Sequence, residues 1–256
     1  MSLKLPNEKL SSLVSIAIAA SHAIMKIYDQ EIVVGHKADN SPVTAADLAA
    51  ELVILAGLKR DFPGIPVVSE ERHAAGHKVE IGETFFLVDP LDGTKEFISR
   101  NGEFTVNIAL IHQGVPVMGV VLAPALDEIF TGQQGVGARK AKLPALDLQS
   151  ITARHCPSGG PTILASRSHL DAETQAYIQT QKPASFSNAG SSLKFCRIAE
   201  GAADLYPRFG RTMEWDTAAG HAVLLAAGGN MVKPDGKPFI YGKLGFANGP
   251  FIAKGV

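Results

Sequence analysis

The run Asp89–Thr94 is the part of the sequence best suited to holding a metal ion. It reads Asp-Pro-Leu-Asp-Gly-Thr and follows the apolar segment Phe85–Val88. The proline fixes its own φ and ends a strand, and the glycine permits a left-handed turn. The chain therefore bends sharply, so that Asp89, Asp92 and the Leu91 carbonyl can face one point. Such oxygen ligands suit a hard divalent cation, although an Asp-rich turn that caps local amides would have the same residues.

Three further carboxylates stand at the ends of predicted elements. Glu70 follows the apolar strand Val67–Ser69, and Asp216 opens an apolar helix. Asp47 lies three residues after Thr44, in the spacing of a capping box. Each has a structural interpretation, as a solvated strand end, a helix N-cap and a capping-box member respectively. The functional interpretation of Asp47 is a base that helps to activate water.

Thr94 follows the glycine of the acidic turn and precedes the segment Lys95–Ile98. If a short helix begins here, its free N–H groups would hold a phosphate. Thr94 would then lie between the metal ions and that phosphate. A plain N-cap threonine is the structural alternative, and the two roles can coexist.

The elements that must position these residues follow from hydrophobic periodicity. Apolar steps of three and four predict helices over 8–28 and 45–60, the second capped by Thr44. β-branched and aromatic runs predict strands at 67–69, 84–89, 104–112, 115–122 and 128–131, with Gln113-Gly114 as a hairpin turn. After 160 we expect strands at 162–166, near 185 and at 204–208, and helices from 171, over 192–200 and over 217–227.

The loose, proline- and glycine-containing segment 140–160 marks a soft boundary. We therefore expect an α/β (α+β) protein of two halves packed side by side. Residues 1–150 would form an α+β half with most of the acidic residues, and residues 151–256 an α/β half with Asp216 and substrate contacts. Pockets commonly form at such junctions, so the site should lie between the halves.

Composition excludes several classes of protein. The 256 residues carry 24 Lys+Arg against 25 Asp+Glu, a net charge of -1, so there is no basic footprint for nucleic acid. Cys156 and Cys196 are the two cysteines, too few for a disulfide-built scaffold. We see neither a signal peptide at the start nor an apolar stretch long enough to span a membrane, and we expect a cytoplasmic protein.

Together the acidic elements resemble the inositol monophosphatase-like superfamily of magnesium-dependent, lithium-sensitive phosphatases. Its signatures D-P-[LI]-D-G-[ST] and W-D-x-[AS]-x-G are present as Asp89–Thr94 and Trp215–Gly220. Stretches at 37–44, 92–97, 166–169, 190–195 and 206–210 are similar to the bacterial 3'(2'),5'-bisphosphate nucleotidase branch. The resemblance covers nearly the whole chain and is weakest in the N-terminal helix, over 73–82 and in the last dozen residues. It implies the layered αβαβα sandwich of the inositol monophosphatase and sugar phosphatase type.

Carried over residue by residue, the resemblance implies metal ligands, a water-activating pair and substrate contacts. Two or three Mg²⁺ ions would be held by Glu70, Asp89, the Leu91 carbonyl, Asp92 and Asp216. Asp47 and Thr94 would form the water-activating pair. The substrate would be contacted by Glu70, Leu91, Asp92, Gly93, Thr94, Ser166, His169, Gly190, Lys194, Arg208 and Asp216, with Lys194 and Arg208 as candidates for binding its second phosphate.

The activity that the resemblance implies is removal of the 3'-phosphate from 3'-phosphoadenosine 5'-phosphate to give AMP and phosphate. 3'-Phosphoadenylyl sulfate is a further candidate substrate, and the context would be recycling of the by-product of sulfate assimilation. Inositol monophosphate or a sugar bisphosphate would use the same chemistry. An inactive sensor of a phosphorylated ligand is the alternative of another class. A monomer and a homodimer both remain open, as does the peripheral membrane association of some relatives.

Overall fold

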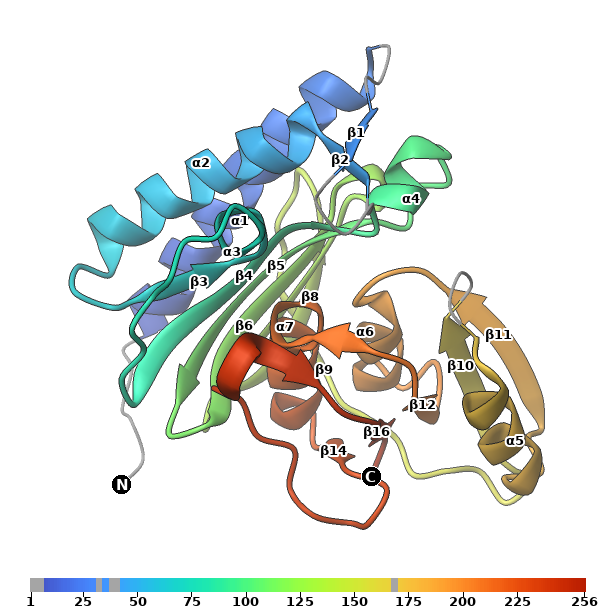
Figure 1. Cartoon of the computed structure of the whole chain (residues 1–256). Helices are drawn as coiled ribbons and strands as arrows, with labels where there is room; N and C mark the ends of the chain where they lie inside the picture. Colours follow the sequence, from blue (N-terminus) through green and yellow to red (C-terminus); the bar gives the residue numbers. More distant parts are fainter. Residues whose placement is uncertain (1–6, 31–33, 37–41, 167–169) are drawn as a thin grey trace.

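The computed structural model describes residues 7–30, 34–36, 42–166 and 170–256 (Figure 1). Its first sheet has seven strands in the order β3-β4-β5-β6-β7-β8-β9, antiparallel except for the parallel pair β3 and β4. The strands are β3 (Val67–Ser69), β4 (Thr84–Asp92), β5 (Thr105–His112), β6 (Val115–Ala123), β7 (Glu128–Gln133), β8 (Gly137–Lys142) and β9 (Gln149–Ile151). The short elements near it are β1 (Val34–His36), β2 (Pro42–Thr44), α3 (Glu70–Ala74), α4 (Thr94–Ile98) and η1 (Pro124–Leu126).

Helices cover both faces of this sheet (Figure 1). On one face lie α1 (Asn7–Tyr28) and α2 (Ala45–Asp61), and on the other lie α6 (Leu193–Ala199) and α7 (Glu214–Ala226). Beyond α6 and α7 stands a second sheet, and α5 (Ala172–Thr180) packs on its far face. The layers therefore alternate as αβαβα, as the family resemblance implied.

The second sheet has the order β11-β10-β12-β16-β14. Its strands are β10 (Thr162–Ser166), β11 (Ser185–Ala189), β12 (Leu205–Arg208), β14 (Asn230–Val232) and β16 (Phe251–Lys254). The small pair β13 (Thr212–Met213) with β15 (Ala247–Asn248) and the turn η2 (Leu244–Phe246) complete the C-terminal half.

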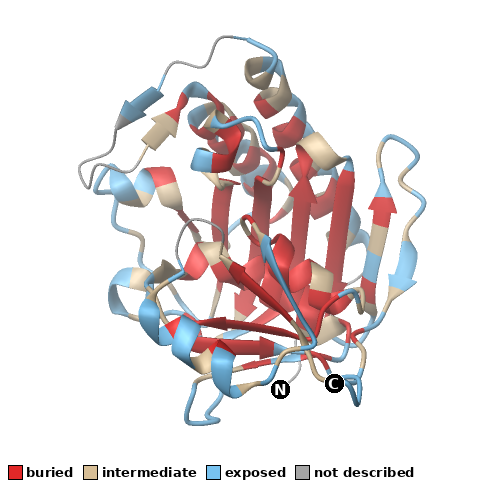
Figure 2. Ribbon diagram, turned by 90° about the vertical axis from the view of Figure 1, so that its right-hand side faces the viewer, coloured by how far each residue is buried: buried red, intermediate tan, exposed pale blue. Residues whose placement is uncertain are grey.

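Alternation along β4 explains why both faces of the first sheet need a cover. Phe85 and Leu87 join the hydrophobic core on the side of α7, whereas Phe86 and Val88 join the core under α1 and α2. Successive strand residues point to opposite faces, so a strand that is apolar throughout must be buried on both sides. The buried residues accordingly fill the sheets and the helices between them (Figure 2).

Two glycines let α7 approach the first sheet closely. A Cβ on Gly132 would stand 2.6 Å from the Cα of Val223 and 2.7 Å from the carbonyl oxygen of Ala222. A Cβ on Gly119 would stand 2.8 Å from the carbonyl oxygen of Ala219. The obstructing atoms are helix backbone, which cannot rotate away. The depth of α7, and with it the position of Asp216 at its start, therefore depends on these two glycines.

The expected helices and strands up to residue 133 are present with small shifts, including the capping box of Thr44 and Asp47. The sequence prediction was wrong on two local points. Pro90 does not end its strand, because β4 continues to Asp92 through a bulge, where a proline is tolerated. The last helix begins at Glu214 rather than Thr217, which places Asp216 inside its first turn instead of at the cap.

The helix α1 corrects a third expectation. From Glu8 to Tyr28 it is long and apolar enough to cross a membrane by length and composition alone. In this fold the apolar residues of α1 form part of the protein core, because Leu13, Ile16 and Ala20 are buried against α2 and the first sheet.

The boundary predicted between residues 150 and 151 falls between the two sheets, but α6 and α7, which follow it in the sequence, pack on the first sheet. The division into halves at residues 1–150 and 151–256 stays a prediction.

We predict that Gly132→Ala destabilises the protein by about 1–3 kcal/mol, the usual cost of overpacking a well-packed core. The matched control is Gly82→Ala, since a Cβ on Gly82 meets nothing within 4 Å. The check is urea unfolding followed by circular dichroism. Equal unfolding midpoints for the two variants would contradict the close approach of α7.

Candidate active site

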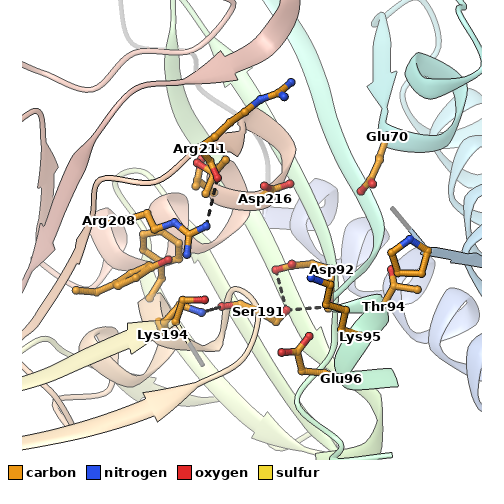
Figure 3. Close-up of a pocket in the computed structure, with 17 residues that line it drawn as sticks. Glu70, Asp92, Thr94, Lys95, Glu96, Ser191, Lys194, Arg208, Arg211 and Asp216 are labelled. Carbon is orange, nitrogen blue, oxygen red and sulfur yellow. Dashed lines mark hydrogen bonds between the residues drawn. The ribbon is translucent and has the colours of Figure 1, made fainter. Parts of the chain in front are cut away.

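Carboxylates from three separate elements meet in one place. Glu70 at the start of α3, Asp89 on β4 and Asp216 in α7 each offer an oxygen, and these oxygens lie within 4.8 Å of one another. Figure 3 shows Glu70, Asp92 and Asp216 directed into the same cleft. The acidic residues that are far apart in the sequence are thus brought together as expected.

The bulge in β4 explains how Asp89 and Asp92 reach the same site. Asp89 pairs with Asn107 and Asp92 pairs with Thr105, so three steps on β4 match two on β5. The backbone N–H of Leu91 donates to Asp89 Oδ1 at 3.0 Å, which fixes the turn. The next residue, Gly93, has φ 93°, in the left-handed region that a glycine adopts without strain. The Leu91 side chain is buried in the core, and its carbonyl oxygen lies 3.5 Å from Thr94 Oγ1.

The acidic cluster is electrostatically strained without a cation. Burial raises the pKa of Asp216 well above its ordinary value, and the charges of Asp92 and Glu70 raise it further. Burial also raises the pKa of Asp92, against the hydrogen bond from Ser191 and the charge of Lys194. All the candidate ligands are oxygens, the donor type that hard divalent cations select. The donor set therefore fits such an ion.

Asp47 is held by the helix cap and faces Thr94. Its Oδ2 accepts from the backbone N–H of Thr44 at 2.8 Å and from the Thr44 hydroxyl at 2.7 Å. Its Oδ1 accepts from Thr94 Oγ1 at 3.3 Å. The structural and the functional interpretations of Asp47 are therefore compatible, because the capping box uses one carboxylate oxygen and the other faces Thr94. The role as a base stays a prediction.

A cleft of about 270 Å³ lies between the two halves beside these residues. It is lined by Pro42, Glu70, Asp92, Gly93, Thr94, Lys95, Glu96, Ser166, Ser191, Lys194, Phe195, Tyr206, Arg208, Arg211, Thr212, Asp216 and Thr217. Of the predicted site residues, Asp47, Asp89, Leu91 and Gly190 do not line it. His169 lies outside the described residues.

Two buried cationic side chains line the cleft from the C-terminal half of the protein. The Lys194 ammonium donates to the carbonyls of Ala189 at 3.1 Å and Ser191 at 2.6 Å, and burial lowers its pKa to about 8. The Arg208 guanidinium, on a residue only 6% exposed, donates to the carbonyls of Gly210 at 3.3 Å and Arg211 at 3.2 Å. Each side chain therefore keeps a fixed position in the wall.

Gly190 serves packing in this structure. Its N–H donates to Glu103 Oε2 at 2.8 Å, and a Cβ on it would stand 2.7 Å from the Glu103 carbonyl oxygen. Ser191, Lys95 and Arg211 also line the cleft, although no role was predicted for them from the sequence. Ser191 lies within the stretch 190–195 that carried the resemblance, so that stretch was the signal that could have found it.

Comparison with known proteins agrees with this geometry. The model of the inositol monophosphatase family matches residues 7–254. This chain belongs to that family. It is 47% identical over 234 residues to the 3'(2'),5'-bisphosphate nucleotidase CysQ of Escherichia coli K12, covering 91% of this chain and 93% of the relative.

Solved structures of family members show the same fold. The crystal structure of CysQ from Bacteroides thetaiotaomicron superposes with a TM-score of 0.80 at 37% identity, over 97% of each chain. The inositol monophosphatase from Anabaena superposes with a TM-score of 0.74 at 26% identity, over 96% of this chain and 89% of the other. The family and the layered fold are thus those that the sequence indicated.

We predict that protons and divalent cations compete at Asp92 and Asp216. Their raised pKa values mean that the metal-free folded protein favours the protonated forms, so its stability falls as pH rises from the ordinary Asp range through the raised values. Metal affinity should instead weaken as pH is lowered, because protons then occupy the carboxylates. This loss should begin at a pH above the ordinary range of Asp pKa values. Calorimetric titration of Mn²⁺ in buffers of different ionisation enthalpy measures the released protons.

The control for this prediction is Asp216→Asn, which removes the most strongly shifted carboxyl. It should raise the stability of the metal-free protein at neutral pH and reduce proton release on Mn²⁺ binding. An Mn²⁺ affinity that stays constant from pH 8 to 5, without proton release, would contradict the raised values.

Proposed function

We propose that this chain is a Mg²⁺-dependent phosphomonoesterase that removes the 3'-phosphate of 3'-phosphoadenosine 5'-phosphate, giving AMP and phosphate. The observation that carries the proposal is the Asp47–Thr94 hydrogen bond directly beside the acidic cluster. Relatives named 3'(2'),5'-bisphosphate nucleotidase, 40% to 48% identical over more than nine tenths of this chain, support the choice of substrate. 3'-Phosphoadenylyl sulfate remains a second candidate substrate.

Two or three Mg²⁺ ions would be held by the carboxylates of Glu70, Asp89, Asp92 and Asp216 and by the Leu91 carbonyl. When bound, the ions would make a water acidic enough to attack at neutral pH and would offset charge on the leaving oxygen. Positioning and electrostatics supply most of the acceleration in phosphoryl transfer. A hard-cation site in a family of phosphatases supports this assignment.

The protein's own contribution to the chemistry is a short proton relay. Thr94 Oγ1 donates to Asp47 Oδ1 and Thr94 lines the cleft, so its hydroxyl oxygen would accept a proton from the attacking water. Asp47 then takes up the Thr94 proton while its other oxygen stays bound to Thr44. The capping box holds the Asp47 carboxylate in place at the start of α2, so the base would not have to move during the reaction.

The second phosphate would bind at the wall formed by Lys194 and Arg208, with Ser166 nearby. Two buried cationic side chains in one wall suit a phosphate dianion that lies away from the acidic cluster. An inositol monophosphate has no second phosphate to use them, which is why the bisphosphate is favoured. A cytoplasmic location and a monomeric or dimeric state stay predictions.

The direct test is phosphate release from 3'-phosphoadenosine 5'-phosphate with and without Mg²⁺, with inositol 1-phosphate as the comparator. We predict that Thr94→Val and Asp47→Asn lower kcat about 10²–10⁴-fold, the usual contribution of a positioned proton acceptor. Thr94→Ser keeps the hydroxyl and should retain most activity, which makes it the matched control. Ligand binding without phosphate release by the wild type would favour a sensor instead.

We also predict that Lys194→Met raises KM for 3'-phosphoadenosine 5'-phosphate at least tenfold, or about 1.4 kcal/mol. The substrate 3'-AMP lacks the 5'-phosphate, so its KM should change much less. Because the pKa of Lys194 is lowered to about 8, the wild-type KM for the bisphosphate should rise as pH rises through that value. Equal changes in KM for both substrates would contradict the assignment of Lys194 to the second phosphate site.

A further inference from the structure

A polar network lies buried directly behind the acidic cluster. In β5, Thr105 and Asn107 share one face, and their neighbours Val106 and Ile108 enter the apolar core on the other. Thr105 and Asn107 are 0% exposed, and Ser192, just before α6, is 1% exposed. Burying a polar group raises the free energy of the folded state unless the group is hydrogen-bonded, so the partners of these side chains indicate their role.

These partners form a chain from one predicted metal ligand to another. Asn107 Nδ2 donates to Asp92 Oδ2 at 3.3 Å and to Ser192 Oγ at 3.0 Å. Ser192 Oγ in turn donates to the backbone carbonyl of Asp216 at 2.7 Å. Three consecutive links thus connect Asp92 at the end of β4 to Asp216 in α7.

A second arm closes the network on Asp92. Ser191 Oγ donates to Asp92 Oδ2 at 2.7 Å (Figure 3). It also lies 2.6 Å from Thr105 Oγ1. Thr105 Oγ1 donates to Asn107 Oδ1 at 3.0 Å. Ser191 has φ 54°, a left-handed conformation that is uncommon for a residue other than glycine. Asp92 is therefore fixed from two sides.

We propose that Asn107 and Ser192 are positioning residues that set the distance between Asp92 and Asp216 for metal binding. The proposal rests on the proposed function. Both side chains are fully buried, so they reach neither substrate nor solvent and act through the Asp92 carboxylate and the Asp216 backbone carbonyl. Together they tie the end of β4 to the first turn of α7. Without these links, the separation of Asp92 and Asp216 would lose that constraint in the metal-free protein.

The expected effect is a loss of metal affinity. Groups that orient the ligands of a metal typically change its affinity 10–100-fold when they are removed. Ser192→Ala breaks the link to Asp216, and Asn107→Leu breaks the links to both Ser192 and Asp92 while keeping the branched shape of the side chain. Because one broken link uncouples the ends, the double variant should bind metal no more weakly than the weaker single variant.

The experiment is calorimetric titration of the metal-free protein with Mn²⁺, together with thermal unfolding in the absence of metal. The matched control is Ser21→Ala in α1, since Ser21 is 3% exposed and its hydroxyl donates to the Ile18 carbonyl at 2.8 Å. We expect Ser192→Ala and Asn107→Leu to weaken Mn²⁺ binding at least tenfold. Ser21→Ala should bind Mn²⁺ like the wild type.

Other outcomes would overturn the proposal. Wild-type Mn²⁺ affinity in both folded variants would assign the network to stability alone, as would failure of both variants to fold. Additive losses in the double variant would show two independent effects rather than one chain. A wild type that binds no Mn²⁺ and releases no phosphate would instead remove the proposed function, so the two failures are distinguishable.

Discussion

The repulsion between partly buried carboxylates is the constraint on which this structure depends. Asp92 and Glu70 both raise the free energy of a charged Asp216, and partial burial removes water that would screen these charges. Separated on a flexible surface, they would move apart. They stay together because each is anchored by a different rigid element, so the fold supplies a site for which a cation is the natural complement.

The central layer of the sandwich provides that rigidity. The helix α7 lies between the two sheets, presents Asp216 at its start and packs on β6 and β7 at Gly119 and Gly132. The backbone N–H of Met213 donates to Asp216 Oδ2 at 2.8 Å, which fixes the carboxylate in the first turn. On the opposite face, α2 fixes Asp47 through its capping box. Helices on opposite faces of the first sheet thus bring Asp47 and Asp216 to the same site.

Much of this arrangement could be predicted from local signals. Helical spacing located α1 and α2, and the acidic turn with its glycine located the bend before Thr94. The Pro90 prediction failed because a proline ends a regular strand but is accepted in a bulge, and the bulge depends on pairing with β5, which is not local. The start of α7 was misplaced because Asp216 matches an N-cap as well as a first-turn position.

The positioning network could not be predicted for the same reason. Asn107 and Thr105 read as ordinary residues of a strand, and Ser192 as a helix start. Their role depends on contacts across more than 80 positions of sequence, such as the 85 between Asn107 and Ser192. Hydrophobic periodicity defines the faces of an element, whereas the partner of a buried polar group is decided by tertiary packing.

The most direct measurement is a crystal structure of the protein soaked in Mn²⁺, with the ion located by its anomalous scattering. The account predicts anomalous peaks among Glu70, Asp89, Asp92 and Asp216, at bonding distance from their oxygens. Density showing these side chains turned apart, with no ion among them, would contradict it.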